Sequence, residues 1–281
     1  MINTICIVGA GTMGSGIAMV GAQSGIPVLL FDISMAGLEK GKASIQKNLQ
    51  WMAEKKKITA AEKDNIFQRI SFINDINDCV ADLIIEAIIE KTEAKVDLFN
   101  QLAKINSPNT IFATNTSSLS VSAIQAHVVN AERVVGMHFF NPAQVMKLVE
   151  VVKGDQTGDD VAQTIFELCA QMKKTAVMCS DAPGFIVNRV ARHYYLEAMN
   201  IVQSGIATIE NVDEVMEACG FKMGPFKLMD LIGLDINFAV SESLYKAFNG
   251  IERFKPSTIQ QDKVAKGELG KKSGRGFYEY K

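Results

Sequence analysis

The sequence has few of the features that mark secreted, membrane or nucleic-acid-binding proteins. Its 281 residues include five cysteines, one tryptophan and three histidines. The cysteines are scattered, odd in number and form no C-x-x-C pair, so we expect reduced, mostly buried thiols in a cytosolic protein. A net charge of −2 predicts no general attraction to nucleic acid or to an anionic membrane. We also expect no metal site.

Long apolar runs are also missing. None approaches the roughly 20 residues of a transmembrane helix, so we expect no membrane segment. The chain begins almost at once with an apolar run, and we therefore expect no signal peptide or transit segment and a cytoplasmic location. Hydrophobic residues make up 48% of the chain, which is ample for a core, and the length allows two domains.

A glycine-rich segment follows the first apolar run. Residues 5–8 (ICIV) predict a strand, and the small residues from 15 to 22 predict a helix. Between them lies a G-x-G-x-x-G segment made of Gly9, Ala10, Gly11, Thr12, Met13 and Gly14. In this strand–turn–helix context the motif indicates a dinucleotide site, with the phosphates at the helix N-terminus. The alternative is a turn that merely needs glycines.

Asp32 indicates which dinucleotide is bound. It ends a second apolar run, residues 28–31, roughly twenty residues after the glycines, where a carboxylate accepts a hydrogen bond from the ribose 2′-hydroxyl of NAD. The same charge repels the 2′-phosphate of NADP, and the next six residues contain no basic group. We therefore expect NAD as the cofactor.

The order of predicted elements indicates an α/β fold with a second, helical domain. Further strands are expected at 70–73, 81–87, 110–114, 133–140, 146–152 and 175–179, with helices at 91–105 and 159–172 and an inserted helical hairpin at 37–57 and 59–69. This pattern predicts a Rossmann-type domain with a mostly parallel sheet over residues 1–183. Residues 184–281 read as an all-α domain, with helices at 185–204, 210–219, 225–232, 234–248 and 257–266 and a strand-like tail at 277–280. We expect that domain to close the substrate cleft and to build a dimer.

A polar turn follows the strand at 110–114. Asn115, Thr116, Ser117 and Ser118 would lie at the carboxyl end of a parallel strand, which is the ligand-binding edge of such a sheet, and would start a helix. We expect this turn to contact a ligand, with Asn115 and Ser117 as candidates beside the cofactor. A simple helix cap is the alternative.

His138 and Glu150 are the candidate acid–base pair. Glu150 alternates with three apolar residues on one face of its strand, so its carboxylate must find a partner, and an Asn-Pro turn between the two strands could bring His138 beside it. A histidine held by an acid is typical of a general base. His127 and His193 have no comparable setting.

The hairpin ends on a run of lysines, residues 55–57. This run is either a solvated helix end or a binding site for a polyphosphorylated ligand.

Together these segments resemble the short-chain L-3-hydroxyacyl-CoA dehydrogenase family, which includes the bacterial 3-hydroxybutyryl-CoA dehydrogenases, over essentially the whole chain. The likeness is carried by GAGTMGSGIA from Gly9, IFATNTSSLS from Ile111, GMHFFNPAQVMKLVEVV from Gly136, DAPGFIVNR from Asp181, MGPFKLMDLIGLD from Met223 and the closing KKSGRGFYEYK.

The resemblance implies roles for these and several further residues. His138 is implied as the catalytic histidine and Glu150 as its partner, with Ser117 and Asn188 completing the substrate site. Beside the NAD it places Glu90, Lys95, Asn141 and Lys272. The hairpin is implied as an arm that binds CoA, with Lys55 near the CoA phosphates and Asn48 at another position. A homodimer that acts on a CoA thioester is the family expectation.

One departure from the family pattern follows Asn188. The family usually continues after VNR with an apolar segment and a proline, whereas here Arg192 and His193 occupy this part of the helix. Two alternatives to a thioester dehydrogenase remain at this stage. One is a dehydrogenase of a free hydroxy acid, as in the gulonate dehydrogenase and lens-crystallin branch, and the other is a non-catalytic NAD-binding protein.

Overall fold

The computed structural model describes residues 2–280. Contacts within the chain divide it into two compact units, Met1–Ala182 and Pro183–Lys281. No helix within residues 2–280 is long and apolar enough to cross a bilayer.

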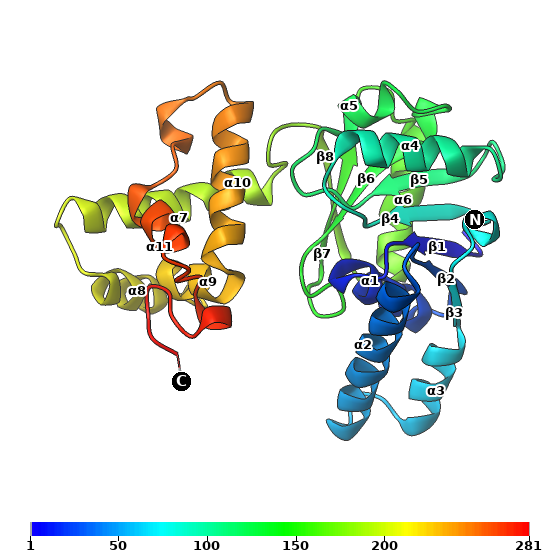
Figure 1. Cartoon of the computed structure of the whole chain (residues 1–281), viewed down its shortest axis with the longest axis horizontal. Coiled ribbons are helices and arrows are strands. Elements are labelled where there is room, and N and C mark those ends of the chain that lie inside the picture. The colour runs from blue at the N-terminus through cyan, green and yellow to red at the C-terminus, as the bar shows by residue number, and fades with distance from the viewer. Residues whose placement is uncertain (1, 281) are drawn as a thin grey trace. The chain divides into compact units, whose positions relative to one another are not determined.

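The first unit is built on one eight-stranded sheet (Figure 1), with the order β3-β2-β1-β4-β5-β6-β7-β8. Every neighbouring pair is parallel except β6 and β7. Strands β1, β2, β4 and β5 are short and largely buried, as parallel strands covered on both faces are, whereas β3 at the edge is partly exposed. The strands are β1 Ile5–Val8, β2 Val28–Phe31, β3 Ile70–Ile73, β4 Leu83–Glu86, β5 Ile111–Thr114, β6 Val134–Phe139, β7 Leu148–Lys153 and β8 Thr175–Ser180. The expectation of a mostly parallel Rossmann-type sheet is confirmed.

The strand order reverses between β1 and β4, and this reversal positions the candidate site. Right-handed crossovers place the helices that follow β1 and β2 on one face of the sheet and the helix that follows β4 on the other. A ligand-binding crevice forms where the order reverses, outside the carboxyl ends of the strands. The helices of this unit are α1 Thr12–Gln23, α2 Met35–Glu54, α3 Ala60–Gln68, α4 Thr92–Ala103, α5 Val121–Gln125 and α6 Asp159–Gln171, with short 3₁₀ turns at Ile76–Asp78 and Ala131–Arg133.

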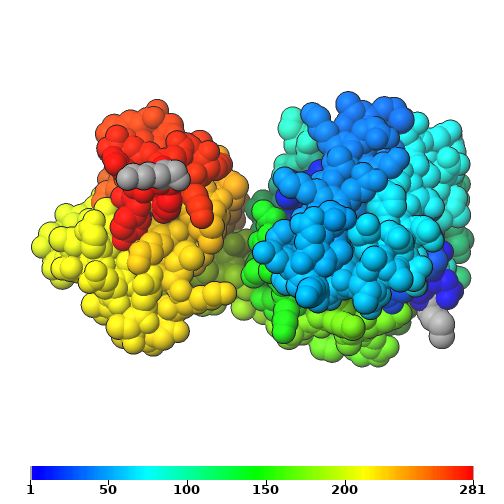
Figure 2. All heavy atoms as spheres, turned by 90° about the horizontal axis from the view of Figure 1, so that it is seen from below, coloured from blue at the N-terminus to red at the C-terminus, as the bar shows by residue number. Residues whose placement is uncertain are grey.

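The hairpin of α2 and α3 extends beyond the sheet (Figure 1), and its atoms are prominent on the first unit in the space-filling view (Figure 2). Leu38, Ile45 and Leu49 of α2 are buried, so one face of the long helix belongs to the core while its far end is exposed. A capping box at Thr59 and Glu62 starts α3, because each side chain bonds the other residue's backbone N–H.

The second unit is helical, with an apolar core that includes Leu196, Met199, Phe226 and Met229. Its helices are α7 Val187–Gln203, α8 Ile209–Ala218, α9 Pro225–Ile232, α10 Leu234–Ala247 and α11 Thr258–Ala265, with 3₁₀ turns at Glu252–Phe254 and Lys271–Ser273. The prediction of a strand-like tail at 277–280 is wrong. The described part of this tail makes only isolated bridges, such as that between Arg275 and Glu279.

Element boundaries differ from the predicted ones by a few residues. The first helix of the hairpin runs over Met35–Glu54 rather than 37–57, because the Ser34 side chain caps it by accepting a hydrogen bond from Gly37 N–H. The turn at 115–118 does not itself start a helix. The helix begins later, at Val121, where Ser120 supplies the cap.

Candidate active site

The glycine segment forms an open cradle at the N-terminus of α1. Gly9 has φ of 105°, and a Cβ on Gly14 would lie 1.7 Å from the carbonyl oxygen of Gly9, so neither position accepts a side chain. A Cβ on Gly11 would instead meet nothing within 4 Å. No side chain caps the helix, so its first N–H groups are available to an anion beside Gly11. This geometry fits a dinucleotide pyrophosphate.

Asp32 lies next to this cradle. Its two oxygens accept hydrogen bonds from the backbone N–H groups of Ala10, at 2.8 Å, and Ser34, at 2.9 Å, which fix the carboxylate at the end of β2. It lines a cavity of about 630 Å³ together with Val8, Gly9, Phe31, Ile33, Asn74, Asp75, Ile76, Ile88, Ala94, Asp97, Leu98 and Gln101. A mostly apolar cavity with one fixed carboxylate suits an adenosine whose ribose hydroxyls need an acceptor.

A buried ion-pair network lies at the carboxyl ends of β4 and β5. Lys95 is 1% exposed, and its Nζ lies 2.6 Å from Oε1 of Glu86 and 3.1 Å from Oε2 of Glu90. Burial acts to raise the pKa of Glu90, but the charge of Lys95 and the hydrogen bonds from Thr116 and Ser117 outweigh it, so the pKa lies below its usual value. Lys95 therefore holds two carboxylates in place at this edge.

The polar turn after β5 is fixed by Glu90. Oε1 of Glu90 accepts hydrogen bonds from Thr116 Oγ1 at 2.5 Å and from Ser117 N–H at 3.0 Å. Oδ1 of Asn115 accepts from Phe139 N–H at 2.9 Å, which joins the ends of β5 and β6. Asn141 is exposed just beyond β6. Acceptor oxygens of Glu90 and Asn115 therefore fix the edge of the sheet at which the sequence predicts ligand contacts.

His138 and Glu150 face each other across the antiparallel pair β6 and β7. Nδ1 of His138 lies 2.7 Å from Oε2 of Glu150, and both side chains are buried, at 6% and 1% exposure. The Phe140 ring packs on the imidazole, with 4.5 Å between centroids. Glu150 thus fixes the ring orientation and the tautomer with a proton on Nδ1, which leaves Nε2 as the nitrogen that can exchange a proton with a substrate.

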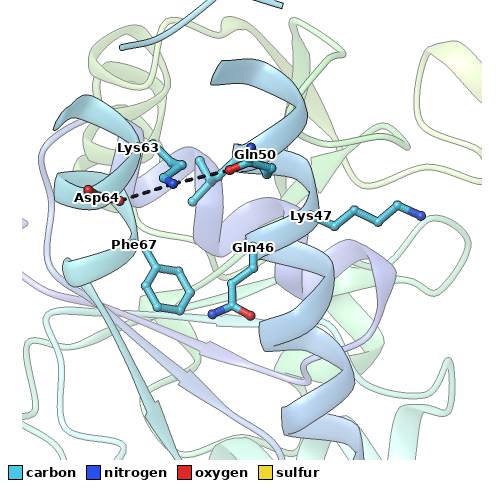
Figure 3. Close-up of a pocket in the computed structure, with 7 residues that line it drawn as sticks. Gln46, Lys47, Gln50, Lys63, Asp64 and Phe67 are labelled. Atoms are coloured by element: carbon cyan, nitrogen blue, oxygen red, sulfur yellow. Dashed lines mark hydrogen bonds and ion pairs between the residues drawn. The ribbon is translucent and has the colours of Figure 1, made fainter. Parts of the chain in front are cut away.

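The hairpin contains its own cavity, of about 390 Å³, lined by Gln46, Lys47, Leu49, Gln50, Lys63, Asp64 and Phe67. Gln46, Gln50, Lys63 and Phe67 lie in the space between α2 and α3, whereas the Lys47 side chain points away from them (Figure 3). Neither Asn48, which is half-buried on α2, nor Lys55, which is exposed at its C-terminus, lines this cavity. Their assignment to CoA stays a prediction.

Two predicted site residues belong to the second unit. Asn188 is the second residue of α7. Lys272 lies in the 3₁₀ turn Lys271–Ser273, and its Nζ is held by Asp235, 2.6 Å and 2.7 Å from the two carboxylate oxygens. Their roles beside substrate and NAD stay predictions.

Glu86 is the member of this site that sequence reasoning missed. It ends an apolar strand, is 0% exposed, and accepts hydrogen bonds from Thr114 Oγ1 at 2.8 Å and Ile88 N–H at 2.8 Å besides its ion pair with Lys95. The sequence feature that could have identified Glu86 is its position at the end of a fully apolar run. When such a strand is buried, the carboxylate must find hydrogen-bonding or charged partners.

Comparisons with known proteins agree with this geometry. Residues 4–182 match the family model for the 3-hydroxyacyl-CoA dehydrogenase NAD binding domain, and residues 184–280 match that for the C-terminal domain of the same enzymes. The chain is 46% identical to a 3-hydroxyadipyl-CoA dehydrogenase of Escherichia coli, with all of this chain covered but only 59% of that protein. It is 41% identical to a probable 3-hydroxybutyryl-CoA dehydrogenase of Deinococcus radiodurans, covering 98% of this chain and 99% of that one.

Solved structures give the same result. A crystal structure of (S)-3-hydroxybutyryl-CoA dehydrogenase from Ralstonia eutropha superposes with a TM-score of 0.95 at 40% identity, and the match covers 100% of both chains. With a nucleotide-binding first unit, a histidine–glutamate pair at the sheet edge and family matches over both units, the chain belongs to the 3-hydroxyacyl-CoA dehydrogenase family.

Proposed function

We propose that this protein interconverts (S)-3-hydroxyacyl-CoA and 3-oxoacyl-CoA with NAD, and that 3-hydroxybutyryl-CoA and acetoacetyl-CoA are one such pair of substrates. The observation that carries the proposal is the buried pair of His138 and Glu150, 2.7 Å apart at the ligand-binding edge of the sheet. A family-wide likeness supports the reaction class, and the (S) stereochemistry follows from the relatives alone.

The chemistry divides between the cofactor and the protein. Bound NAD would supply the acceptor for the hydride of C3 of the hydroxyacyl group, and NADH would supply the hydride in the reverse direction. Nε2 of His138 accepts the proton of the 3-hydroxyl in oxidation, so that the O–H bond breaks as the C=O bond forms, and it donates that proton to the 3-oxo oxygen in reduction. Glu150 stabilises the imidazolium that forms between these steps.

Other residues position the reactants. Ser117 and Asn188 are proposed to hydrogen-bond the 3-oxygen, and Asn115, Asn141, Glu90, Lys95 and Lys272 to surround the cofactor. For Lys95 and Glu90 the ion pair favours an indirect role, because Lys95 orders Glu90 and Glu90 orders the turn that carries Ser117. Misplacement by about 1 Å can cost 10²-fold in rate, so this support matters for catalysis.

The CoA portion is proposed to lie along the hairpin. Lys55, Lys56 and Lys57 are exposed at the end of α2, where they offer positive charge to the CoA phosphates. Asn48 lies two turns earlier on the same helix. The relatives are named for two kinds of substrate. One is a 3-hydroxybutyryl thioester, whose acyl chain ends in a methyl group, and the other is a 3-hydroxyadipyl thioester, whose acyl chain ends in a carboxylate. We propose that the active site accepts the shorter chain and leave the longer one as a second candidate.

Assembly and location are also proposals. The second unit exposes large apolar side chains, among them Val215, Phe221, Leu231 and Ile236, which supports a homodimer formed through this unit. The five cysteines are free thiols, which suits the reducing cytoplasm.

The test is the initial rate of NADH oxidation with acetoacetyl-CoA, run beside NADPH and beside free acetoacetate. The proposal expects turnover that requires both NADH and the CoA ester. Activity on the free acid would favour the hydroxy-acid branch, and NADH binding without turnover of any substrate would favour a binding protein.

A further inference from the structure

The only tryptophan of the chain is exposed on the hairpin. Trp51 lies in the last turn of α2, and 46% of its surface is accessible to solvent. Four residues earlier, the Lys47 side chain points away from the space between α2 and α3 (Figure 3). Residues four apart on a helix are neighbours on one face, so Lys47, Trp51 and Lys55 form a row on a side of α2 that does not face α3.

The turn after α2 brings another lysine onto the indole ring. Lys56 has φ of 54°, and its N–H donates to the carbonyl oxygen of Ala53 at 2.9 Å. The N–H of Lys57 donates to the carbonyl oxygen of Met52, also at 2.9 Å, so the helix ends in a Schellman motif. This turn places Nζ of Lys57 4.4 Å from the centre of the Trp51 ring. The motif commonly includes an apolar contact at this point, but a smaller side chain than tryptophan also makes it.

The charge around the indole ring is positive. Residues 47–57 contain four lysines and a single acid, Glu54, which accepts a hydrogen bond from Gln50 Nε2 at 3.0 Å. A lone exposed apolar side chain is ordinary on a protein surface. An exposed aromatic ring among lysines is a combination that suits a nucleotide, because the base stacks on the ring and the phosphates pair with the ammonium groups.

The adenosine end of CoA has the chemistry that this surface requires. Its ribose carries a 3′-phosphate and a 5′-diphosphate besides the adenine, so anionic groups lie on both sides of the base. Lys47 and Lys55 lie about 6 Å along the helix on either side of Trp51. NAD lacks a 3′-phosphate, and its adenosine has a separate cavity beside Asp32.

We propose that Trp51 is a substrate-binding residue whose indole ring stacks on the adenine of the CoA portion, while the lysines around it pair with the phosphates. The inference rests on the proposed function, since it takes CoA to lie along the hairpin. The adenine takes no part in hydride transfer, so the stack stabilises bound substrate and transition state equally. Its loss therefore raises KM and leaves kcat unchanged.

The first test compares acetoacetyl-CoA with acetoacetyl-pantetheine, which has the same thioester but no nucleotide, in reduction by NADH. Trp51→Leu keeps an apolar contact for the Lys57 stem and removes the aromatic ring. The ratio of kcat/KM for the CoA thioester to that for the pantetheine thioester should fall at least about 5-fold, through KM. Trp51→Phe keeps a smaller ring and should give an intermediate ratio. Loss of folded enzyme does not affect this ratio, because both substrates report the same active fraction.

Phe67→Leu is the matched control. Phe67 lies in the space between α2 and α3 (Figure 3) and lines the hairpin cavity, so the same type of substitution is made on another side of α2. The ratio in Phe67→Leu should equal that of the wild type. A fall in Phe67→Leu, with no change in Trp51→Leu, would place the base in the hairpin cavity and overturn the inference.

The single tryptophan also gives a direct readout of binding. Titration with CoA in the absence of NADH should quench the emission of Trp51 with saturation, because the adenine stacks on the indole ring. Adenosine 3′,5′-bisphosphate should quench the same emission, whereas pantetheine should leave it unchanged.

Unchanged emission at CoA concentrations that inhibit acetoacetyl-CoA reduction would overturn the inference, and so would a wild-type ratio in Trp51→Leu. In both cases turnover of acetoacetyl-CoA leaves the proposed function intact. Turnover of neither thioester would instead refute the proposed function, and the inference with it.

Discussion

Nζ of Lys95 lies 2.6 Å from Oε1 of Glu86, and both side chains are withdrawn from solvent, at 1% and 0% exposure. The lysine comes from α4 and the glutamate from the end of β4, so the pair ties a helix to the edge of the sheet at which ligands bind. Lys95 also contacts Glu90, which orders the turn containing Ser117. A structural ion pair is therefore continuous with the candidate active site.

Replacing Lys95 with methionine should strongly destabilise the first unit. Glu86 would remain buried without its partner, and breaking such a pair costs about 3 kcal/mol in the free energy of unfolding. Urea denaturation measures this loss. The double variant Glu86→Gln/Lys95→Met removes the stranded charge and should recover a large part of it. If the double variant is no more stable than Lys95→Met, burial of the unpaired Glu86 charge is not the cause.

His138→Gln should lower kcat by at least about 10²-fold, because the reaction loses its positioned acid–base group. Glu150→Gln should lower it comparably, since an amide that donates to Nδ1 holds the imidazole in the wrong tautomer. NADH affinity, measured by fluorescence titration, serves as the control and should stay within about twofold in both variants. A near-normal rate in His138→Gln would remove His138 from the mechanism.

Alanine at Gly11 and at Gly14 should separate cofactor binding from folding. The added methyl group at Gly11 meets no protein atom and occupies the space proposed for the pyrophosphate, so KM for NADH should rise at least about 10-fold while stability changes by less than about 1 kcal/mol. At Gly14 it clashes with the Gly9 carbonyl and should cost about 3 kcal/mol. Steady-state kinetics and thermal unfolding measure the two effects, and equal loss of stability in both variants would contradict this account.

Asp32→Asn should reduce the preference for NADH over NADPH by at least about 10-fold. The change removes the charge that repels a 2′-phosphate, while the amide oxygen can still accept the hydrogen bond from Ala10 N–H. The ratio of kcat/KM for the two cofactors measures the effect. Asp78→Asn, in the 3₁₀ turn outside the cavity, is the matched control. A preference that is unchanged in Asp32→Asn would show that another group excludes NADP.

The thiols should differ widely in reactivity at pH 8. Burial raises the pKa of Cys169 to about 12 and that of Cys179 to about 11, so both are protonated there, and Cys6 and Cys79 are buried. Cys219 is exposed. A thiolate-specific disulfide reagent should therefore modify one thiol quickly, and Cys219→Ser should abolish that fast phase. Two or more fast thiols in the native protein would contradict these pKa directions.

Local patterns in the sequence predicted much of the fold. Apolar runs bounded by turn residues located the buried strands to within a few residues, because a strand covered on both faces needs apolar side chains throughout. The glycine segment and Asp32 were identifiable because each directly follows one of the first two apolar runs, where a nucleotide-binding turn needs glycines and a ribose needs a carboxylate. The contact of His138 with Glu150 was also predictable, since the Asn-Pro turn between their strands indicated that the two strands pair, and the apolar alternation around Glu150 showed that its carboxylate needs a partner.

Other features were decided only by the tertiary structure. The start of α5 at Val121 depends on which hydroxyl caps it, and the bond between Asn115 and Phe139 depends on the pairing of β5 with β6. Glu86 reads as an ordinary strand end until α4 brings Lys95 over it. Arg192 reads as a surface charge on a helix until α10 and α11 bury it. The physical reason is the same in each case: the energy of a polar or charged group depends on its desolvation and its partners, and both are supplied by residues distant in the sequence.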